Sequence, residues 1–108
     1  MSYKFNREAV LKQAQTHNSF YLYDESIILE NTTRLKNDFS NVDFLYSMKT
    51  NPHPMVVKTI LSQGFGVDAA SLAEAVMGHE NGVSKDMIQY SAPGKTPQEI
   101  EAALGIST

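Results

Sequence analysis

Several features that would assign a protein to a particular class are missing from this sequence. It contains no cysteine, which excludes a disulfide framework and a thiolate metal site. No stretch has the apolar length of a membrane span, and the N-terminus lacks the apolar segment of a signal peptide. The net charge is −3 and the nine Lys and Arg residues are scattered, so there is no basic footprint for nucleic acid or an anionic membrane. We therefore expect a cytoplasmic protein that binds neither.

The composition that remains is typical of a folded α/β chain. Hydrophobic residues make up 42% and charged residues 19% of the sequence. Segments with strand composition begin near residues 20, 43, 65 and 87, and segments with helical character lie between them. This alternation predicts βα units, a parallel sheet and right-handed crossovers. It does not by itself separate a barrel from an open doubly wound sheet.

Local signals mark where the helices begin and end. Gly64 should stop the helix that follows Pro54, and Gly105 should end the last helix, after which Ile106 begins a further strand. A side chain that accepts a hydrogen bond from the first turn is expected at each of the other helix starts. These capping positions are Asn6, Asp24, Ser71 with Glu74, and Thr96 with Glu99.

Lys49 occupies the most informative position in the chain. It follows the apolar run of residues 42–48, which is rich in aromatic residues and indicates a buried strand that enters a loop. Alternation along the strand places Leu45, Ser47 and Lys49 on one face, with room beside the amine for a flat molecule. Burial favours a neutral, nucleophilic amine. From spacing alone, a chemical role and a solvated lysine at a strand end both stay open.

Three sequence blocks, in this order, resemble a known family. They are residues 46–51 (YSMKTN), 64–74 (GFGVDAASLAE) and 90–95 (YSAPGK). Together they resemble the N-terminal third of the fold-type III pyridoxal-phosphate decarboxylases, which act on ornithine, diaminopimelate, arginine or carboxynorspermidine. The resemblance covers roughly residues 20–108, and Ser47 stands where that family usually has alanine. It implies that Lys49 carries pyridoxal 5'-phosphate as an internal aldimine.

The resemblance also implies the fold and the domain organisation. It predicts a partial (β/α)8 barrel of the alanine-racemase type with about three strand–helix units, where a complete barrel takes about 250 residues. Residues 1–23 would form an N-terminal helix and a strand that bridges two domains. Residues 24–108 would form the truncated N-terminal part of the barrel. We expect a fragment of a longer enzyme; the alternative is that another copy supplies the missing strands.

The same resemblance assigns roles to three residues. Lys49 would be both catalytic and cofactor-binding, and Asp68 and Glu74 would bind the cofactor. Asp68 could instead satisfy loop N–H groups, and Glu74 could act only as a helix cap. The substrate would be a small amino acid and the full-length enzyme a homodimer. We expect the isolated chain to be inactive, because the family's phosphate loop and ring-nitrogen partner lie beyond residue 108.

The sequence leaves several other functions open. The same barrel serves amino-acid racemases and cofactor carriers, and a truncated paralogue could act as a regulator or partner subunit. An independent open-sheet binding domain is a further alternative. Residues 91–96 do not form a phosphate-binding P-loop, because Gln89 stands where the motif needs glycine. His17, His53 and His79 lack the spacing of metal ligands and are expected at the surface, so no metal is predicted.

Overall fold

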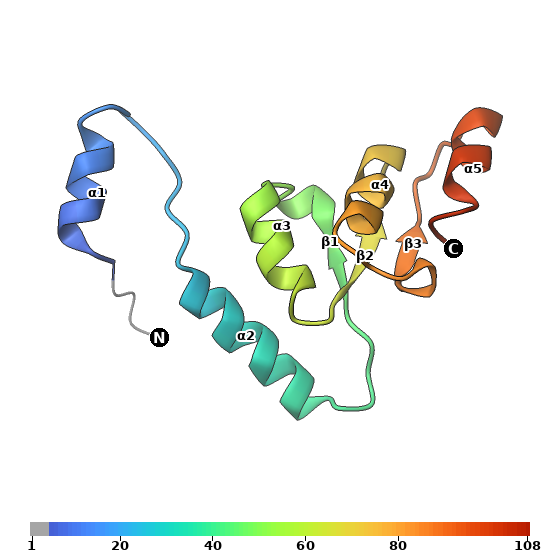
Figure 1. Ribbon diagram of the computed structural model, residues 1–108, viewed down its shortest axis with the longest axis horizontal. Coiled ribbons are helices and arrows are strands. Elements are labelled where there is room, and N and C mark those ends of the chain that lie inside the picture. Colours follow the sequence, from blue (N-terminus) through green and yellow to red (C-terminus); the bar gives the residue numbers. More distant parts are fainter. Residues whose placement is uncertain (1–4) are drawn as a thin grey trace.

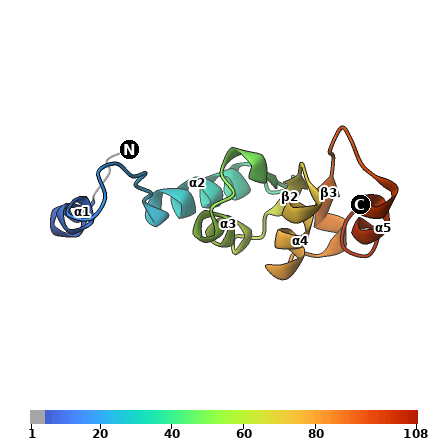
Figure 2. The same cartoon turned by 90° about the horizontal axis from the view of Figure 1, so that it is seen from above.

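The computed structural model describes residues 5–108, so residues 1–4 of the expected N-terminal unit lie outside the described part. Figure 1 shows α1 at one end of an elongated molecule and α5 at the other, and Figure 2 shows the same order from above. In the described residues no helix has the length and apolar character needed to cross a membrane. The elements are α1 (Arg7–Ala14), α2 (Glu25–Asp38), β1 (Leu45–Ser47), the 3-10 helix η1 (Met48–Thr50), α3 (Pro54–Leu61), β2 (Gly66–Ala69), α4 (Leu72–Glu80), the 3-10 helix η2 (Lys85–Met87), β3 (Ile88–Tyr90) and α5 (Pro97–Ala103).

The strands form a parallel sheet in the order β1-β2-β3, as the alternation of strands and helices predicts. Thr108 pairs with β3 on the side away from β2. The Thr108 N–H donates to the Ile88 carbonyl at 2.8 Å, and the Tyr90 N–H donates to the Thr108 carbonyl at 2.9 Å. This pair of bonds is the ladder pattern of a parallel strand. The strand expected to begin at Ile106 is not observed there, because Ile106 lies in the turn after α5 and its N–H donates to the Ala103 carbonyl at 3.0 Å.

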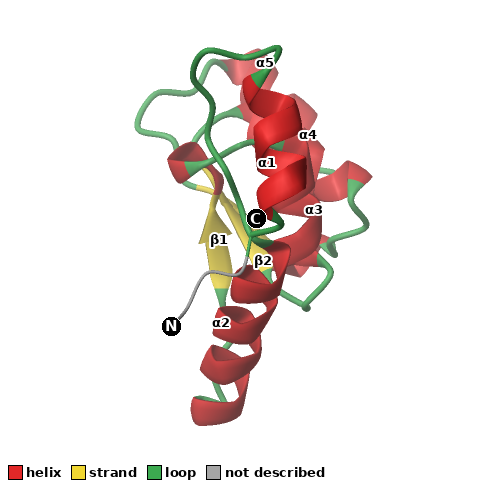
Figure 3. Ribbon diagram, turned by 90° about the vertical axis from the view of Figure 1, so that its left-hand side faces the viewer, coloured by secondary structure: helices red, strands yellow, loops and turns green. Residues whose placement is uncertain are grey.

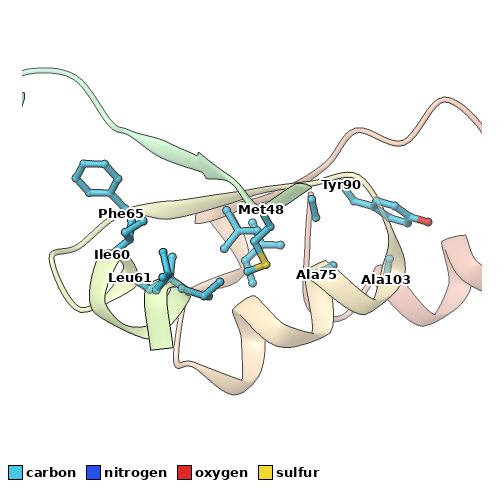
Figure 4. Packing of buried hydrophobic residues seen from close by; sticks show 12 residues of the cluster. Met48, Ile60, Leu61, Phe65, Ala75, Tyr90 and Ala103 are labelled. Atoms are coloured by element: carbon cyan, nitrogen blue, oxygen red, sulfur yellow. The ribbon is translucent and has the colours of Figure 1, made fainter. Parts of the chain in front are cut away.

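The helices that follow the strands cover one face of the sheet and leave the other face bare (Figure 3). Val67 and Ile88 have no exposed surface, whereas Leu45 and Gln89, on the opposite face, are exposed. Figure 4 shows the core packed between the sheet and these helices. The buried cluster consists of Met48, Val56, Val57, Ile60, Leu61, Phe65, Val67, Ala69, Ala75, Ile88, Tyr90 and Ala103.

The strand expected over residues 20–23 is wrong. This segment has no strand structure and forms the extended connection from α1 to α2 (Figure 1). A strand requires backbone partners on a neighbour, and within residues 5–108 no strand lies beside it. Its aromatic side chains are exposed, and the Tyr21 and Tyr23 rings stack on each other with centroids 6.5 Å apart.

The close approach of α4 to the sheet depends on Gly78. A Cβ atom at this position would lie 2.8 Å from Val67 Cγ2 and 3.4 Å from Ile88 Cδ1. Both neighbours are stiff, fully buried side chains, so Gly78→Val should lower the free energy of unfolding by about 1–3 kcal/mol. Helix propensity alone favours valine slightly over glycine and would make the variant more stable. A lower free energy of unfolding for Gly78→Val would therefore result from the packing contacts.

Urea denaturation of the whole polypeptide measures this effect, and Ala73→Val, at an exposed position on the same helix, is the matched control. We expect the control to cost about 0.5 kcal/mol, from helix propensity only. Equal stability of Gly78→Val and the wild type would contradict the packing argument.

Candidate functional site

Lys49 does not lie on the strand face where alternation placed it. The chain leaves β1 at Ser47 and turns through η1, so Lys49 follows the strand by two residues and its side chain is exposed. The burial expected for Lys49 is not observed, because no described residue covers the bare face of the sheet. The Lys49 amine makes no hydrogen bond or ion pair within the described part of the chain. Lys49 therefore presents an unpaired primary amine at the carboxyl end of a parallel strand.

The turn that carries Lys49 is held from several sides. The Tyr46 hydroxyl donates to the Asn51 carbonyl at 2.8 Å, and the Thr50 hydroxyl donates to the Ser47 carbonyl at 2.8 Å. Met48, next to the lysine, is completely buried in the core (Figure 4). A turn fixed by two hydrogen bonds and a buried neighbour leaves motion mainly to the lysine side chain itself.

Asp68, in the central strand β2, lies at the same carboxyl end of the sheet. It is the register partner of Ser47 on β1, and it shares the uncovered face because its neighbours Val67 and Ala69 are buried against the helices. Its carboxylate is half-buried, and Oδ1 accepts a hydrogen bond of 2.6 Å from the Ser91 hydroxyl. The predicted pairing in sequence order is thus confirmed, while any contact of Asp68 with a cofactor stays a prediction.

Glu74 fixes the turn that follows β2. Its Oε2 accepts a hydrogen bond of 2.6 Å from the Ala70 N–H, and its own N–H donates to the Ser71 hydroxyl at 3.3 Å. Ser71 caps α4 as predicted. The Glu74 carboxylate, however, accepts from the Ala70 N–H and not from the Ser71 N–H that a capping box requires. Thr96 and Glu99, by contrast, form a complete capping box on α5. A cofactor-binding role for Glu74 remains a prediction.

The third sequence block places charged groups around Tyr90. The Lys95 amine lies 4.9 Å from the centroid of the Tyr90 ring, within cation–π range. Burial and then the Glu99 carboxylate raise the pKa of the Tyr90 phenol above its ordinary value. Hydrogen bonds from the Thr96 backbone and then from its side chain lower the pKa of Glu99. These contacts attach the loop after β3 to α5.

Two further features near Lys49 were not predicted. The His53 ring caps α3, with Nδ1 accepting from the Met55 N–H at 3.2 Å. His53 is exposed, as expected for all three histidines, and a histidine cap lies outside the usual Ser, Thr, Asp and Asn signal. In addition, the connection from α1 lies against the loop after Lys49 and forms an open depression. Its lining residues are Tyr21, Tyr23, Thr50, Asn51, Pro52 and His53.

A lysine on a fixed turn after the first strand and an aspartate in the second lie at the end of the sheet where βα-barrel proteins carry their functional residues. Residues 25–107 match the family described as pyridoxal-dependent decarboxylase, pyridoxal binding domain. The chain belongs to this family, in agreement with the resemblance of the three sequence blocks. It is 31% identical over 90 residues to diaminopimelate decarboxylase from Archaeoglobus fulgidus, which covers 83% of this chain. The aligned part is 22% of that relative's length.

Solved structures agree with this assignment. Lysine/ornithine decarboxylase from Vibrio vulnificus, complexed with cadaverine, matches 95% of this chain with a TM-score of 0.71 and 28% identity. Lysine decarboxylase from Selenomonas ruminantium matches 98% with a TM-score of 0.79 at 23% identity, which shows the fold alone. The chain spans 29% and 28% of these two structures. The fold is therefore α/β, and the three parallel strands form part of a barrel.

The family's cofactor is pyridoxal phosphate, and the residues at the end of β1 fit one end of it. A primary amine without a partner can bond covalently to an aldehyde carbon. Ser47 is a small residue at the end of β1, on the face of the sheet that the helices leave bare. Asp68 offers an acceptor for a positive charge. Of the described residues, none forms a glycine-rich phosphate loop of the P-loop type, so these residues account for the aldehyde end only.

Proposed function

We propose that the whole polypeptide containing this chain is a pyridoxal-phosphate-dependent decarboxylase of small amino acids. The observation that carries the proposal is the exposed amine of Lys49 on a fixed turn at the carboxyl end of β1, the strand whose last residue, Ser47, pairs with Asp68. In βα barrels chemistry takes place at this end of the strands. Membership of the pyridoxal-binding family supports the proposal independently.

Each residue would contribute a distinct function. When bound, the cofactor supplies an electron sink for the pair left behind by the departing carboxylate. Lys49 would hold the cofactor by its amine, and η1 would keep that amine at the mouth of the barrel. Asp68 would stabilise positive charge on the Lys49 nitrogen, since a nearby anion favours the protonated form. Glu74 would keep the turn after β2 in place for Asp68.

The substrate we propose is an amino acid that carries a second amine. Diaminopimelate decarboxylase, the lysine/ornithine decarboxylase bound to cadaverine and an ornithine decarboxylase from Caenorhabditis elegans support this class. The C. elegans enzyme is 30% identical to this chain over 90 residues. The proposal includes a homodimer, which comes from the family resemblance, and a cytoplasmic location for the whole polypeptide.

Release of CO₂ from lysine, ornithine, arginine and diaminopimelate, with pyridoxal phosphate added, tests this function. We expect one of the four to be decarboxylated well above the others. Loss of optical rotation without CO₂ release would assign a racemase instead. Binding of the cofactor without turnover of any amino acid would support a carrier or a non-catalytic paralogue.

A further inference from the structure

Ser91, the residue after β3, connects β3 to β2 at the carboxyl end of the sheet, the end where Lys49 lies. Its hydroxyl donates to Asp68 Oδ1 at 2.6 Å, a distance typical of a hydrogen bond to an ionised carboxylate. The hydroxyl is itself held in place, because the Ser91 N–H donates to the Ala69 carbonyl at 3.0 Å. That bond continues the ladder between β2 and β3, in which Asp68 is paired with Gln89. Ser91 thus approaches the carboxylate from a position set by the sheet.

The contact leaves half of the Asp68 carboxylate available. A carboxylate has two oxygens with about four acceptor sites, and Ser91 occupies one of them on Oδ1. Within the described residues Oδ2 accepts no hydrogen bond. The strand neighbour of Asp68 on the other side is Ser47, two residues before Lys49. The carboxylate is therefore fixed by β3 on one side and can accept a positively charged group from the side of β1.

We propose that Ser91 is a positioning residue that orients the Asp68 carboxylate toward the nitrogen of Lys49 once that nitrogen is bonded to the cofactor. This inference rests on the proposed function and extends it to a residue outside the three already assigned. Without the Ser91 hydroxyl, the Asp68 side chain would sample several rotamers. Its negative charge would then lie on average farther from the nitrogen and stabilise its protonated form less.

The test is a pH titration of the visible absorbance of the lysine-bound cofactor in the whole polypeptide. In Ser91→Ala we expect the midpoint to fall by roughly half to one pH unit, a three- to tenfold weaker proton affinity. Ser91→Thr retains a hydroxyl and should restore the wild-type midpoint. Asp68→Asn should shift the midpoint in the same direction and further, and Ser91→Ala added to it should cause no additional shift.

Ser62→Ala is the matched control, since its hydroxyl donates to the Thr59 carbonyl at 2.6 Å at the end of α3 and should leave the midpoint unchanged. A Ser91→Ala protein with reduced thermal stability and an unchanged midpoint would show that Ser91 only ties the loop down, which overturns the proposal. An equal shift in the Asp68→Asn background would also overturn it, because Ser91 would then act without Asp68. A wild-type protein that shows no bound-cofactor absorbance refutes the proposed function itself.

Discussion

Replacing Lys49 by alanine is expected to abolish covalent attachment of pyridoxal phosphate and to lower kcat by about 10⁴-fold or more, the scale seen when a nucleophile is removed. No other described lysine lies at the carboxyl end of β1 on the turn that the Tyr46 and Thr50 hydrogen bonds fix. Lys49→Arg should be equally inactive, because a guanidinium keeps the charge but is not a nucleophile at neutral pH. Visible absorbance of the purified whole polypeptide and its release of CO₂ measure the two effects.

The matched control is Lys58→Ala, an exposed lysine on α3, which should keep both the absorbance and the activity. Residual activity in Lys49→Ala at a tenth of the wild-type level or more would show that another group carries the cofactor. Lys95 is the alternative to examine in that event, since it belongs to the third sequence block and lies over the Tyr90 ring.

The isolated chain of 108 residues is expected not to behave as a compact monomer. One face of its sheet is bare and carries Leu45, and β1 has an unpaired edge (Figure 3). On the other side of the sheet only Thr108 pairs with β3. Unpaired parallel strand edges and an uncovered sheet face favour association with other chains. The same openness leaves the cofactor site incomplete, so we expect this chain alone to be inactive.

Sedimentation velocity at low protein concentration decides this point, and we expect a broad or concentration-dependent distribution. Addition of a separately produced remainder of the polypeptide should convert it to a defined complex. A single sharp monomer boundary together with cooperative thermal unfolding would contradict the prediction. The chain would then be a self-sufficient α/β domain.

Much of the fold could be predicted because its signals are local. Asn6 and Asp24 cap their helices, and Gly64, with a φ of 81°, ends the turn after α3. The order and direction of the strands follow from the even alternation of strands and helices, since a parallel pair needs a crossover. Lys49 was placed at the end of β1 by the same reasoning, and the structure shows it two residues past the strand.

The predictions that failed, and the contacts that were not predicted, depend on tertiary structure or on the exact path of a turn. A strand over residues 20–23 has the right composition but has no partner strand in the described chain. Burial of Lys49 assumed a covered inner face, which residues 5–108 do not supply. The Ser91–Asp68 hydrogen bond joins residues 23 positions apart, and it could be found only once the register of β2 and β3 was known. The reach of Glu74 to Ala70 depends on the exact path of one turn.

The most direct test of the central claim is to identify the residue that carries the cofactor. Borohydride reduction of the whole polypeptide with pyridoxal phosphate bound, followed by proteolysis and peptide mass spectrometry, fixes the cofactor to its lysine. We predict that the pyridoxyl group is found on Lys49. A pyridoxyl group on Lys95, or on no residue at all, would contradict the account.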